Sequence, residues 1–223
     1  MAEPADPTDP TSPAALAYAE AHSEAEPPLL HQLWRETHLQ LMMPRMATGH
    51  WQGRLLSFLS HLIRPRRVLE IGTFTSYAAL CLAEGLTPDG HLHTVEINPE
   101  RASRIRRYVA AAGLSARVTL HVGDAADVLT ELGDETWDLV FIDADKRHNG
   151  RYFDLVIEQV RPGGLLVVDN VLWGGKVLPD YAGRANDADT VAVSTFNERM
   201  RHEPRVVPLL LPVRDGLLLL RKL

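Results

Sequence analysis

The sequence predicts one α/β domain built on a doubly wound sheet of seven strands, most of them parallel. Short apolar segments alternate with amphipathic ones from residue 67 onward, and this alternation is typical of a parallel sheet with helices on both faces. The last two apolar segments, 205–211 and 216–221, are joined by four residues. Because a parallel crossover needs about a dozen residues, these two strands are expected to form an antiparallel hairpin at one edge.

The same alternation gives the position of each element. The predicted strands span residues 67–71, 91–96, 117–122, 137–143, 164–169, 205–211 and 216–221. The predicted helices of the domain span residues 49–63, 75–86, 99–112, 125–132, 152–160 and 187–201. In the first of these helices, apolar residues from Trp51 to Leu62 form one stripe, which is typical of an amphipathic helix.

The chain before this domain divides into two parts. Residues 1–12 are rich in proline and acidic residues and hold no apolar cluster, so we expect a disordered tail. Residues 13–48 hold two helical patterns, the first capped by Ser12 and the second beginning at Pro28. We expect these helices to form a lid on the main domain, which takes residues 49–223.

Composition excludes several classes of protein. The chain has 23 Lys and Arg against 29 Asp and Glu, so nucleic acid, which requires a basic surface, is not expected as the main partner. No apolar run reaches the ~18 residues that cross a bilayer, so no membrane association is expected. The single cysteine, Cys81, forms no internal disulfide, and the first residues lack the pattern of a secretory signal. We therefore expect a cytoplasmic protein.

Acidic residues stand where the strands end, and ligands of open α/β sheets bind at that edge. The first turn holds Gly72 but lacks the further glycines with which a G-x-G-x-x-G turn approaches a pyrophosphate. Glu70 suits a cationic ligand, Glu96 suits the two hydroxyls of a ribose, and Asp124 and Ala125 suit an adenine edge. Together these residues favour S-adenosylmethionine over a nicotinamide nucleotide. The alternative for each acid is that it caps the following helix.

A second group of polar residues follows the fourth and fifth strands. Asp143, Asp169 and Asn170 offer two carboxylates and one amide oxygen, a ligand set that suits Mg²⁺ or Ca²⁺ and is poor for zinc. The alternative is that these residues cap a helix and form a turn. Lys146 comes one short turn after Asp143 and is a candidate general base, its alternative being an ordinary surface lysine.

Three segments resemble the cation-dependent O-methyltransferases, the family of caffeoyl-CoA O-methyltransferase and the animal catechol O-methyltransferase. These segments are VLEIGTFTSYAAL at 68–80, LVFIDADK at 139–146 and DNVLWGGKV at 169–177, and the likeness extends from Met46 to the C-terminus. The resemblance implies a Rossmann-like fold and methyl transfer from S-adenosylmethionine to a hydroxyl of a vicinal dihydroxy aromatic. It further implies Mg²⁺, or another divalent ion such as Ca²⁺ or Mn²⁺, and a homodimer.

The resemblance also assigns roles to residues. Lys146 matches the general base of the family, and Asp143, Asp169 and Asn170 match its metal ligands. The matching cofactor-binding positions are Met46, Thr48, Glu70, Gly72, Thr75, Ser76, Glu96, Ile97, Gly123, Asp124, Ala125, Asp143 and Asp145. Of these, Met46 and Thr48 resemble the segment that closes over the methionine part of the cofactor. The substrate pocket is expected to include Trp173, Asp215 and His148.

Two departures from the family pattern concern ligand binding. Ala78 stands where the family has a serine that helps hold the cofactor carboxylate, and His148-Asn149 replaces an Asn-Tyr pair near the acceptor. The acceptor stays open among an acyl-CoA ester, a small catechol and a polyketide-like phenol. Two other classes also stay open: a nicotinamide-dependent oxidoreductase on the same fold, and a non-catalytic S-adenosylmethionine-binding protein.

Overall fold

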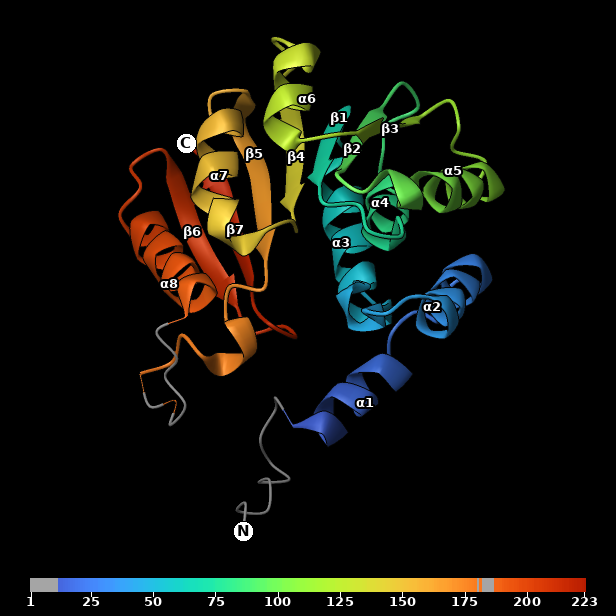
Figure 1. The fold of residues 1–223 in the computed structure, drawn as a ribbon, viewed down its shortest axis with the longest axis horizontal. Coiled ribbons are helices and arrows are strands. Elements are labelled where there is room, and N and C mark those ends of the chain that lie inside the picture. Colours follow the sequence, from blue (N-terminus) through green and yellow to red (C-terminus); the bar gives the residue numbers. More distant parts are fainter. Residues whose placement is uncertain (1–11, 180, 182–186) are drawn as a thin grey trace.

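The computed structural model describes residues 12–179, 181 and 187–223, and these fold around one seven-stranded sheet (Figure 1). The strand order is β3-β2-β1-β4-β5-β7-β6. The strands are β1 (Arg67–Ile71), β2 (His91–Glu96), β3 (Val118–Val122), β4 (Trp137–Ile142), β5 (Val160–Asp169), β6 (Val206–Leu211) and β7 (Leu217–Lys222). The predicted tail, apart from Ser12, and residues 180 and 182–186, between the fifth predicted strand and the last predicted helix, lie outside the described residues.

The pairing of the strands confirms the predicted topology. Strands β3, β2, β1, β4 and β5 are parallel, whereas β7 is antiparallel to both β5 and β6. Ile71 lies opposite Ile142 on β4, and Ile142 lies opposite Val168 on β5. The residues after these three positions therefore meet at one edge of the sheet, where the acidic strand ends were expected.

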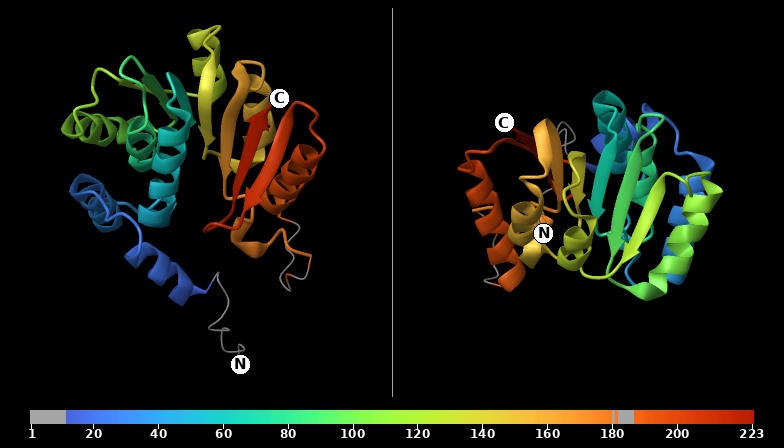
Figure 2. Two further views of the ribbon diagram at one scale, coloured as in Figure 1. Left: turned by 180° about the vertical axis from the view of Figure 1, so that it is seen from behind. Right: turned by 90° about the horizontal axis from the view of Figure 1, so that it is seen from above.

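Helices cover the sheet on both faces (Figure 2). One face packs against α6 (Ala125–Leu132), α7 (Asn149–Val156) and α8 (Ala188–Arg201), with Trp137 and Phe153 fully buried between. The other face packs against α3 (His50–Ile63), α4 (Tyr77–Ala83) and α5 (Ala102–Ala111). This arrangement confirms the doubly wound fold. Among the described residues, no helix is long and apolar enough to span a bilayer.

Three helix starts differ from the prediction by two or three residues. Helix α5 begins at Ala102 rather than residue 99, because a 3₁₀ turn, η2 (Pro99–Arg101), precedes it. Helix α4 begins at Tyr77 rather than residue 75, because Phe74 and Ser76 adopt left-handed backbone conformations, with φ of 51° and 75°. Helix α7 begins at Asn149 rather than residue 152, because a 3₁₀ turn, η3 (Lys146–His148), leads directly into it. Strand β5 correspondingly begins at Val160 rather than residue 164.

Of the two N-terminal helices, α2 (Pro28–Gln40) lies beside α4 and α5, whereas α1 (Pro13–Ala21) extends away from the sheet (Figure 1). Ser12 caps α1 by accepting a hydrogen bond from the Ala15 amide at 3.2 Å, as predicted. Helix α2 buries Leu30 and Leu33 in the core that α3 and α4 share. Helix α2 therefore packs into the main hydrophobic core.

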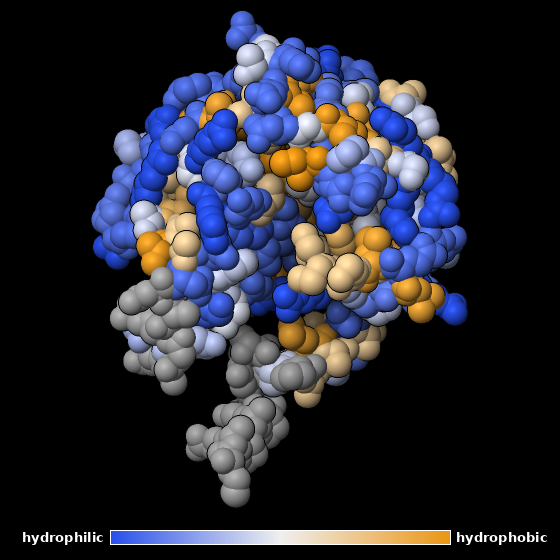
Figure 3. All heavy atoms as spheres, viewed as in Figure 1, coloured by the Kyte–Doolittle hydropathy of each residue, from blue (hydrophilic) through white to orange (hydrophobic). Residues whose placement is uncertain are grey.

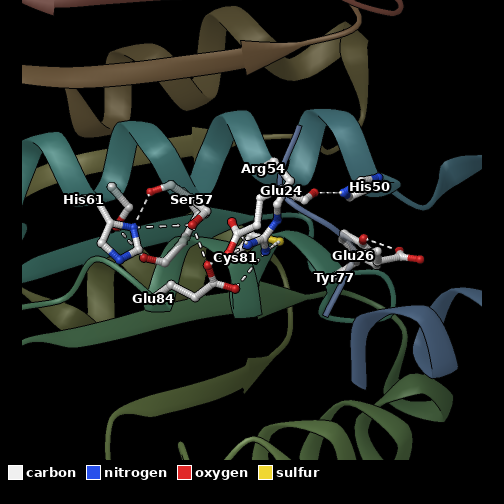
Figure 4. Close-up of polar contacts among 11 residues, drawn as sticks. Glu24, Glu26, His50, Arg54, Ser57, His61, Tyr77, Cys81 and Glu84 are labelled. Atoms are coloured by element: carbon white, nitrogen blue, oxygen red, sulfur yellow. Dashed lines mark hydrogen bonds and ion pairs between the residues drawn. The ribbon is translucent and has the colours of Figure 1, made fainter. Parts of the chain in front are cut away.

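A buried polar cluster holds the α1–α2 connection against the domain (Figure 4). Arg54 of α3 is 9% exposed and donates to both carboxylate oxygens of Glu84, at 3.0 and 2.8 Å, and to Glu24 at 3.2 Å. The Tyr77 hydroxyl donates to Glu26 at 2.6 Å. Breaking such a buried pair leaves an uncompensated charge, so the cluster fixes residues 24–26 beside the start of α4.

Helix α3 turns a face of small and polar residues inward. Gly53, Ser57 and Ser60 are buried, whereas Phe58 and Leu62 are 64% and 68% exposed. A Cβ on Gly53 would lie 2.6 Å from the Tyr77 ring and 2.9 Å from the Cys81 sulfur, so a larger residue would push α3 away from α4. The predicted apolar stripe is therefore divided, with its Leu62 end on the surface.

Candidate active site

The turn after β1 requires glycine at its first position. A Cβ on Gly72 would lie 2.2 Å from the carbonyl oxygen of Asp143, and the residue has φ of 101°, which favours glycine. The amides of Gly72 and Thr73 both donate to the Val95 carbonyl, at 3.0 and 3.1 Å. The turn therefore brings the ends of β1, β2 and β4 into contact.

Glu70 lies beneath this turn and is fully buried. One of its carboxylate oxygens accepts from the Thr94 hydroxyl, while Oε1 has no hydrogen-bond partner among the described residues. The Thr75 hydroxyl oxygen beside the turn is likewise buried without a partner in the described structure. Burial, with smaller contributions from Asp143 and Glu96, raises the pKa of Glu70 to about 8. These free polar atoms fit a ligand that carries an ammonium group.

Glu96 closes β2 and is 2% exposed. Its Oε2 accepts from the Phe74 amide at 2.8 Å, and its Oε1 accepts from the Asn98 amide at 2.8 Å and from Arg101 Nη1 at 3.1 Å. Arg101 also lies over the Phe74 ring, 4.7 Å from its centroid. The carboxylate is thus held in one orientation, with a neighbouring cation that the sequence did not indicate.

The remaining adenosine-side residues gather next to Glu96. The Gly123 amide donates to the Glu96 carbonyl at 3.0 Å, which places Asp124 and Ala125 beside the end of β2. Ile97 is 70% exposed there, available to pack against a ring. Asp124 Oδ1 accepts from the Ala126 amide at 2.9 Å, so this residue caps α6, the alternative role named for it.

The second predicted group converges at the ends of β4 and β5. Lys146 donates to Asp143 Oδ1 at 2.7 Å and is 9% exposed. Asp169 accepts from its neighbour's amide, that of Asn170, at 2.7 Å and from Gln52 Nε2 at 2.8 Å. Burial raises the pKa of Asp143, Lys146 opposes this rise, and the nearby carboxylate of Asp169 adds to it. Because β4 and β5 are parallel neighbours, Asp143 and Asp169 lie at the same edge of the sheet.

The donor set fits a hard divalent cation. Two carboxylates and an amide supply oxygen ligands of the kind that Mg²⁺ and Ca²⁺ prefer. Asn170 adopts a left-handed conformation, with φ of 61°, which asparagine tolerates better than most residues. In the part of the chain that the structure describes, no three His, Cys, Asp or Glu side chains gather to hold a metal ion, so this set depends on the amide of Asn170.

Two of the three predicted substrate residues lie next to this group. The Asp215 carboxylate accepts from the Gly174 amide at 2.5 Å, and the Asp215 carbonyl accepts from the Leu172 amide at 2.8 Å. Burial is the main cause that raises the pKa of Asp215. Trp173 follows on the same loop, in the 3₁₀ turn η4 (Trp173–Gly175), with its indole nitrogen buried and without a partner among the described residues. Both residues can therefore face the molecule that accepts the methyl group.

Asp145 and His148 are partly occupied with each other. His148 Nδ1 lies 3.0 Å from Asp145 Oδ2, and Asp145 also accepts from the Arg147 amide at 3.1 Å as the cap of η3. His148 is 48% exposed at its side chain. The imidazole also lies beside the ring of Tyr152, with 6.1 Å between the ring centroids.

The predicted closing segment lies at the N-terminus of α3. Thr48 is buried and Met46 is 47% exposed. Arg214, in the turn between β6 and β7, donates through Nη1 to the carbonyls of Ala47 and Thr48 and to Gln52 Oε1 at 3.1 Å. Gln52 and Arg214 were not predicted from the sequence.

A signal for the burial of Gln52 is present in the sequence. Gly53, Ser57 and Ser60 recur at helical spacing, which is typical of a face in close contact with a neighbouring element. For Arg214 and Arg101 we find no such signal, because each reaches a partner through a turn whose geometry the sequence does not indicate.

On the face shown in Figure 3, mostly hydrophilic residues line a hollow between the two halves of the molecule.

Residues 20–223 match the family model described as O-methyltransferase. The chain belongs to the O-methyltransferase family. This assignment confirms the predicted family and, with it, the predicted enzyme class of S-adenosylmethionine-dependent O-methyltransferases.

Two relatives and one solved structure illustrate where this O-methyltransferase falls in its family. It is 40% identical over 162 residues to a catechol O-methyltransferase of Mycobacterium tuberculosis, covering 73% of this chain and 72% of the relative. It is 31% identical over 191 residues to a caffeoyl-CoA O-methyltransferase of Stellaria longipes, covering 81% and 78%. The crystal structure of a Podospora anserina methyltransferase with S-adenosylhomocysteine superposes with a TM-score of 0.87 at 28% identity, over 100% of both chains.

Proposed function

We propose that this O-methyltransferase transfers a methyl group from S-adenosylmethionine to one hydroxyl of a vicinal dihydroxy aromatic, with a divalent cation, Mg²⁺ first, held by Asp143, Asp169 and Asn170. The observation that carries the proposal is the buried pair of Lys146 and Asp143 at 2.7 Å, beside Asp169 on the next strand. The two carboxylates would hold a cation, and once that cation has taken their charge the Lys146 amine would be free to give up its proton and act as a base.

Each half of the site has a separate task. When bound, S-adenosylmethionine supplies an electrophilic methyl group and the cation polarises the acceptor hydroxyls. Glu70 holds the cofactor amine and Glu96 the ribose. Lys146 takes the proton of the reacting hydroxyl, and Trp173 and Asp215 orient the acceptor ring. Because attack of an anion on a sulfonium neutralises charge, a buried site favours this reaction.

The other two classes fit the site less well. A nicotinamide nucleotide needs backbone amides free to approach its pyrophosphate, but the amides of Gly72 and Thr73 donate to Val95. A protein that only binds S-adenosylmethionine has no need of a lysine buried against a carboxylate. The relatives act, by their names, on catechol and on caffeoyl-CoA, and both contain or derive from adjacent hydroxyls on an aromatic ring.

We further propose a homodimer that forms through the face where α3 and the β6 edge leave apolar side chains exposed. Phe58 and Leu62 are 64% and 68% exposed on α3, and Val207 and Leu209 are 44% and 56% exposed on β6. Leu209 pairs across strands with Leu219, which packs on the same core as α3. Light scattering should show a dimer in the wild type and a monomer in Leu209→Lys.

A methyl-transfer screen tests the proposed function. Labelled S-adenosylmethionine is supplied with vicinal dihydroxy aromatics, including free catechols, their acyl-CoA esters and polyketide-like phenols, each with added Mg²⁺ or with EDTA. We expect transfer to at least one vicinal diol, only with the cation. Transfer that is confined to acceptors without adjacent hydroxyls, or that is unaffected by EDTA, would contradict the proposal.

A further inference from the structure

The β6–β7 turn reaches both walls of the site. Asp215 holds the acceptor-side loop by accepting from the Gly174 amide at 2.5 Å. Its neighbour Arg214 points the other way, to the carbonyls of Ala47 and Thr48 and to Gln52. Arg214 has φ of 50°, so the left-handed backbone of the turn directs adjacent side chains to opposite walls.

Gln52 joins Arg214 to a proposed metal ligand. Its side chain is buried, and the residue is 1% exposed. The amide nitrogen donates to Asp169 Oδ2 at 2.8 Å, and the amide oxygen accepts from Arg214 Nη1 at 3.1 Å. A flipped amide would place its oxygen against a carboxylate and its nitrogen against a guanidinium. The charges on the two sides therefore fix one orientation of the amide.

The chemistry of an amide suits this position. A lysine or arginine in place of Gln52 would neutralise Asp169 and weaken its attraction for a cation. The neutral Gln52 side chain donates to Asp169 Oδ2 while the carboxylate keeps its charge. The backbone N–H of Asn170 donates to Oδ1 in the same way, at 2.7 Å. Partners that orient a ligating carboxylate without replacing it contribute strongly to metal affinity.

We propose that Gln52 and Arg214 are positioning residues that connect the cofactor-closing segment, Ala47–Thr48, to the metal-binding carboxylate of Asp169. This inference rests on the proposed function, since it assigns these residues toward the cation of that site. Arg214 binds the segment and Gln52 at once, so ordering of Ala47–Thr48 over the cofactor and orientation of Asp169 favour each other. Cofactor and cation should therefore bind cooperatively, and by the same factor in either order.

Binding measurements on the full chain test this proposal without using activity. The Kd of Mg²⁺ is measured by calorimetry with and without S-adenosylhomocysteine, in wild type, Gln52→Leu and Arg214→Met. We expect S-adenosylhomocysteine to tighten Mg²⁺ binding by about 5-fold or more in the wild type, the lower limit of typical coupling. Gln52→Leu should weaken Mg²⁺ binding by about 10–100-fold, the range for partners that orient a metal ligand.

Arg214→Met should retain more of the Mg²⁺ affinity than Gln52→Leu does. In Arg214→Met, however, S-adenosylhomocysteine should no longer tighten Mg²⁺ binding, and Arg214→Lys should restore part of that tightening. Because Arg214 lies in an exposed turn, this variant tests the connection without altering the core. The matched control is Gln32→Leu, on the exposed side of α2, where the glutamine hydrogen-bonds only Glu36 among the described residues. It should behave as wild type.

The outcomes separate this inference from the proposed function. If wild type and Gln52→Leu bind Mg²⁺ equally, or if Arg214→Met keeps the full coupling, the positioning roles are wrong while the metal-dependent reaction stands. If the wild type binds no Mg²⁺, the proposed cation dependence is wrong and the role of Gln52 falls with it.

Discussion

Acidic residues differ in their surroundings between the two halves of the sheet edge at which β1, β2, β4 and β5 end. On the β1–β2 side, Glu70 and Glu96 are held mainly by hydroxyl and backbone donors, and Glu70 keeps one oxygen without a partner among the described residues. On the β4–β5 side, Asp143 faces a lysine and Asp169 faces a glutamine. The first half is built to receive a ligand with its own positive charge. The second half pairs its carboxylates with side-chain donors, an arrangement that the proposed cation site and general base would use.

The largest effect should follow from removing a carboxylate of the β4–β5 half. Asp169→Ala deletes one of three proposed protein ligands, so Mg²⁺ binding should weaken by more than the ~100-fold that loss of an orienting partner can cause. Calorimetry with Mg²⁺ measures this effect, and circular dichroism checks the fold. S-adenosylhomocysteine should still bind, because Glu70 and Glu96 are intact. Mg²⁺ binding at wild-type affinity would remove Asp169 from the site.

Lys146→Met should lower kcat by about 10²–10⁴-fold, the range for loss of a general base. The Kd of S-adenosylhomocysteine should change little, since the residue serves only the reacting hydroxyl. As pH rises toward the pKa of that hydroxyl, less help from a base is needed, so the deficit should shrink. Rate profiles against pH for both proteins with one catechol decide this. Parallel profiles at every pH would show that Lys146 only orients the acceptor.

A smaller effect is expected in the β1–β2 half. Glu96→Ala should weaken S-adenosylhomocysteine binding by about 1–3 kcal/mol, the value of hydrogen bonds to a charged group. Glu100→Ala, an exposed acid on the same loop, is the matched control and should leave the Kd unchanged. An equal Kd for wild type and Glu96→Ala, by calorimetry, would place the ribose contact elsewhere.

The smallest effect concerns pH. Burial raises the pKa of Glu70 to about 8, so the empty site holds it protonated below that pH. Binding of an ammonium group favours the ionised form, and a proton must then be released. The affinity for S-adenosylhomocysteine should therefore rise with pH, by up to about tenfold per unit, and level off above the pKa of Glu70. Glu70→Gln should bind more weakly and lose this slope. An unchanged slope in Glu70→Gln would assign the proton to another group.

The sequence was sufficient for the sheet and for the acids at its edge. Buried strands such as Trp137–Ile142 are nearly continuous apolar segments, and the residue that follows each strand necessarily lies at the edge where ligands bind. The start of α4 was misplaced because Ser76 adopts a left-handed conformation that serine rarely takes, and no local pattern indicates it.

The contacts that orient these acids could not be predicted in the same way. Gln52 reaches Asp169 across 117 positions of sequence, and Arg214 reaches Thr48 across 166. Such contacts depend on how α3 and the β6–β7 turn pack in three dimensions. A polar residue in an amphipathic helix is ordinarily solvent-exposed, so nothing in the sequence singled out Gln52 as a partner of Asp169.

The central claim is that adjacent hydroxyls and a divalent cation are both required for methyl transfer. The most direct measurement is the rate of transfer from saturating labelled S-adenosylmethionine to a catechol and to the matching monophenol, each in EDTA and after Mg²⁺ is restored. The account predicts transfer to the catechol only with Mg²⁺, and a monophenol rate lower by about 100-fold or more, since a single hydroxyl leaves the ring without a fixed orientation. Equal rates for the two acceptors, or a full catechol rate in EDTA, would contradict it.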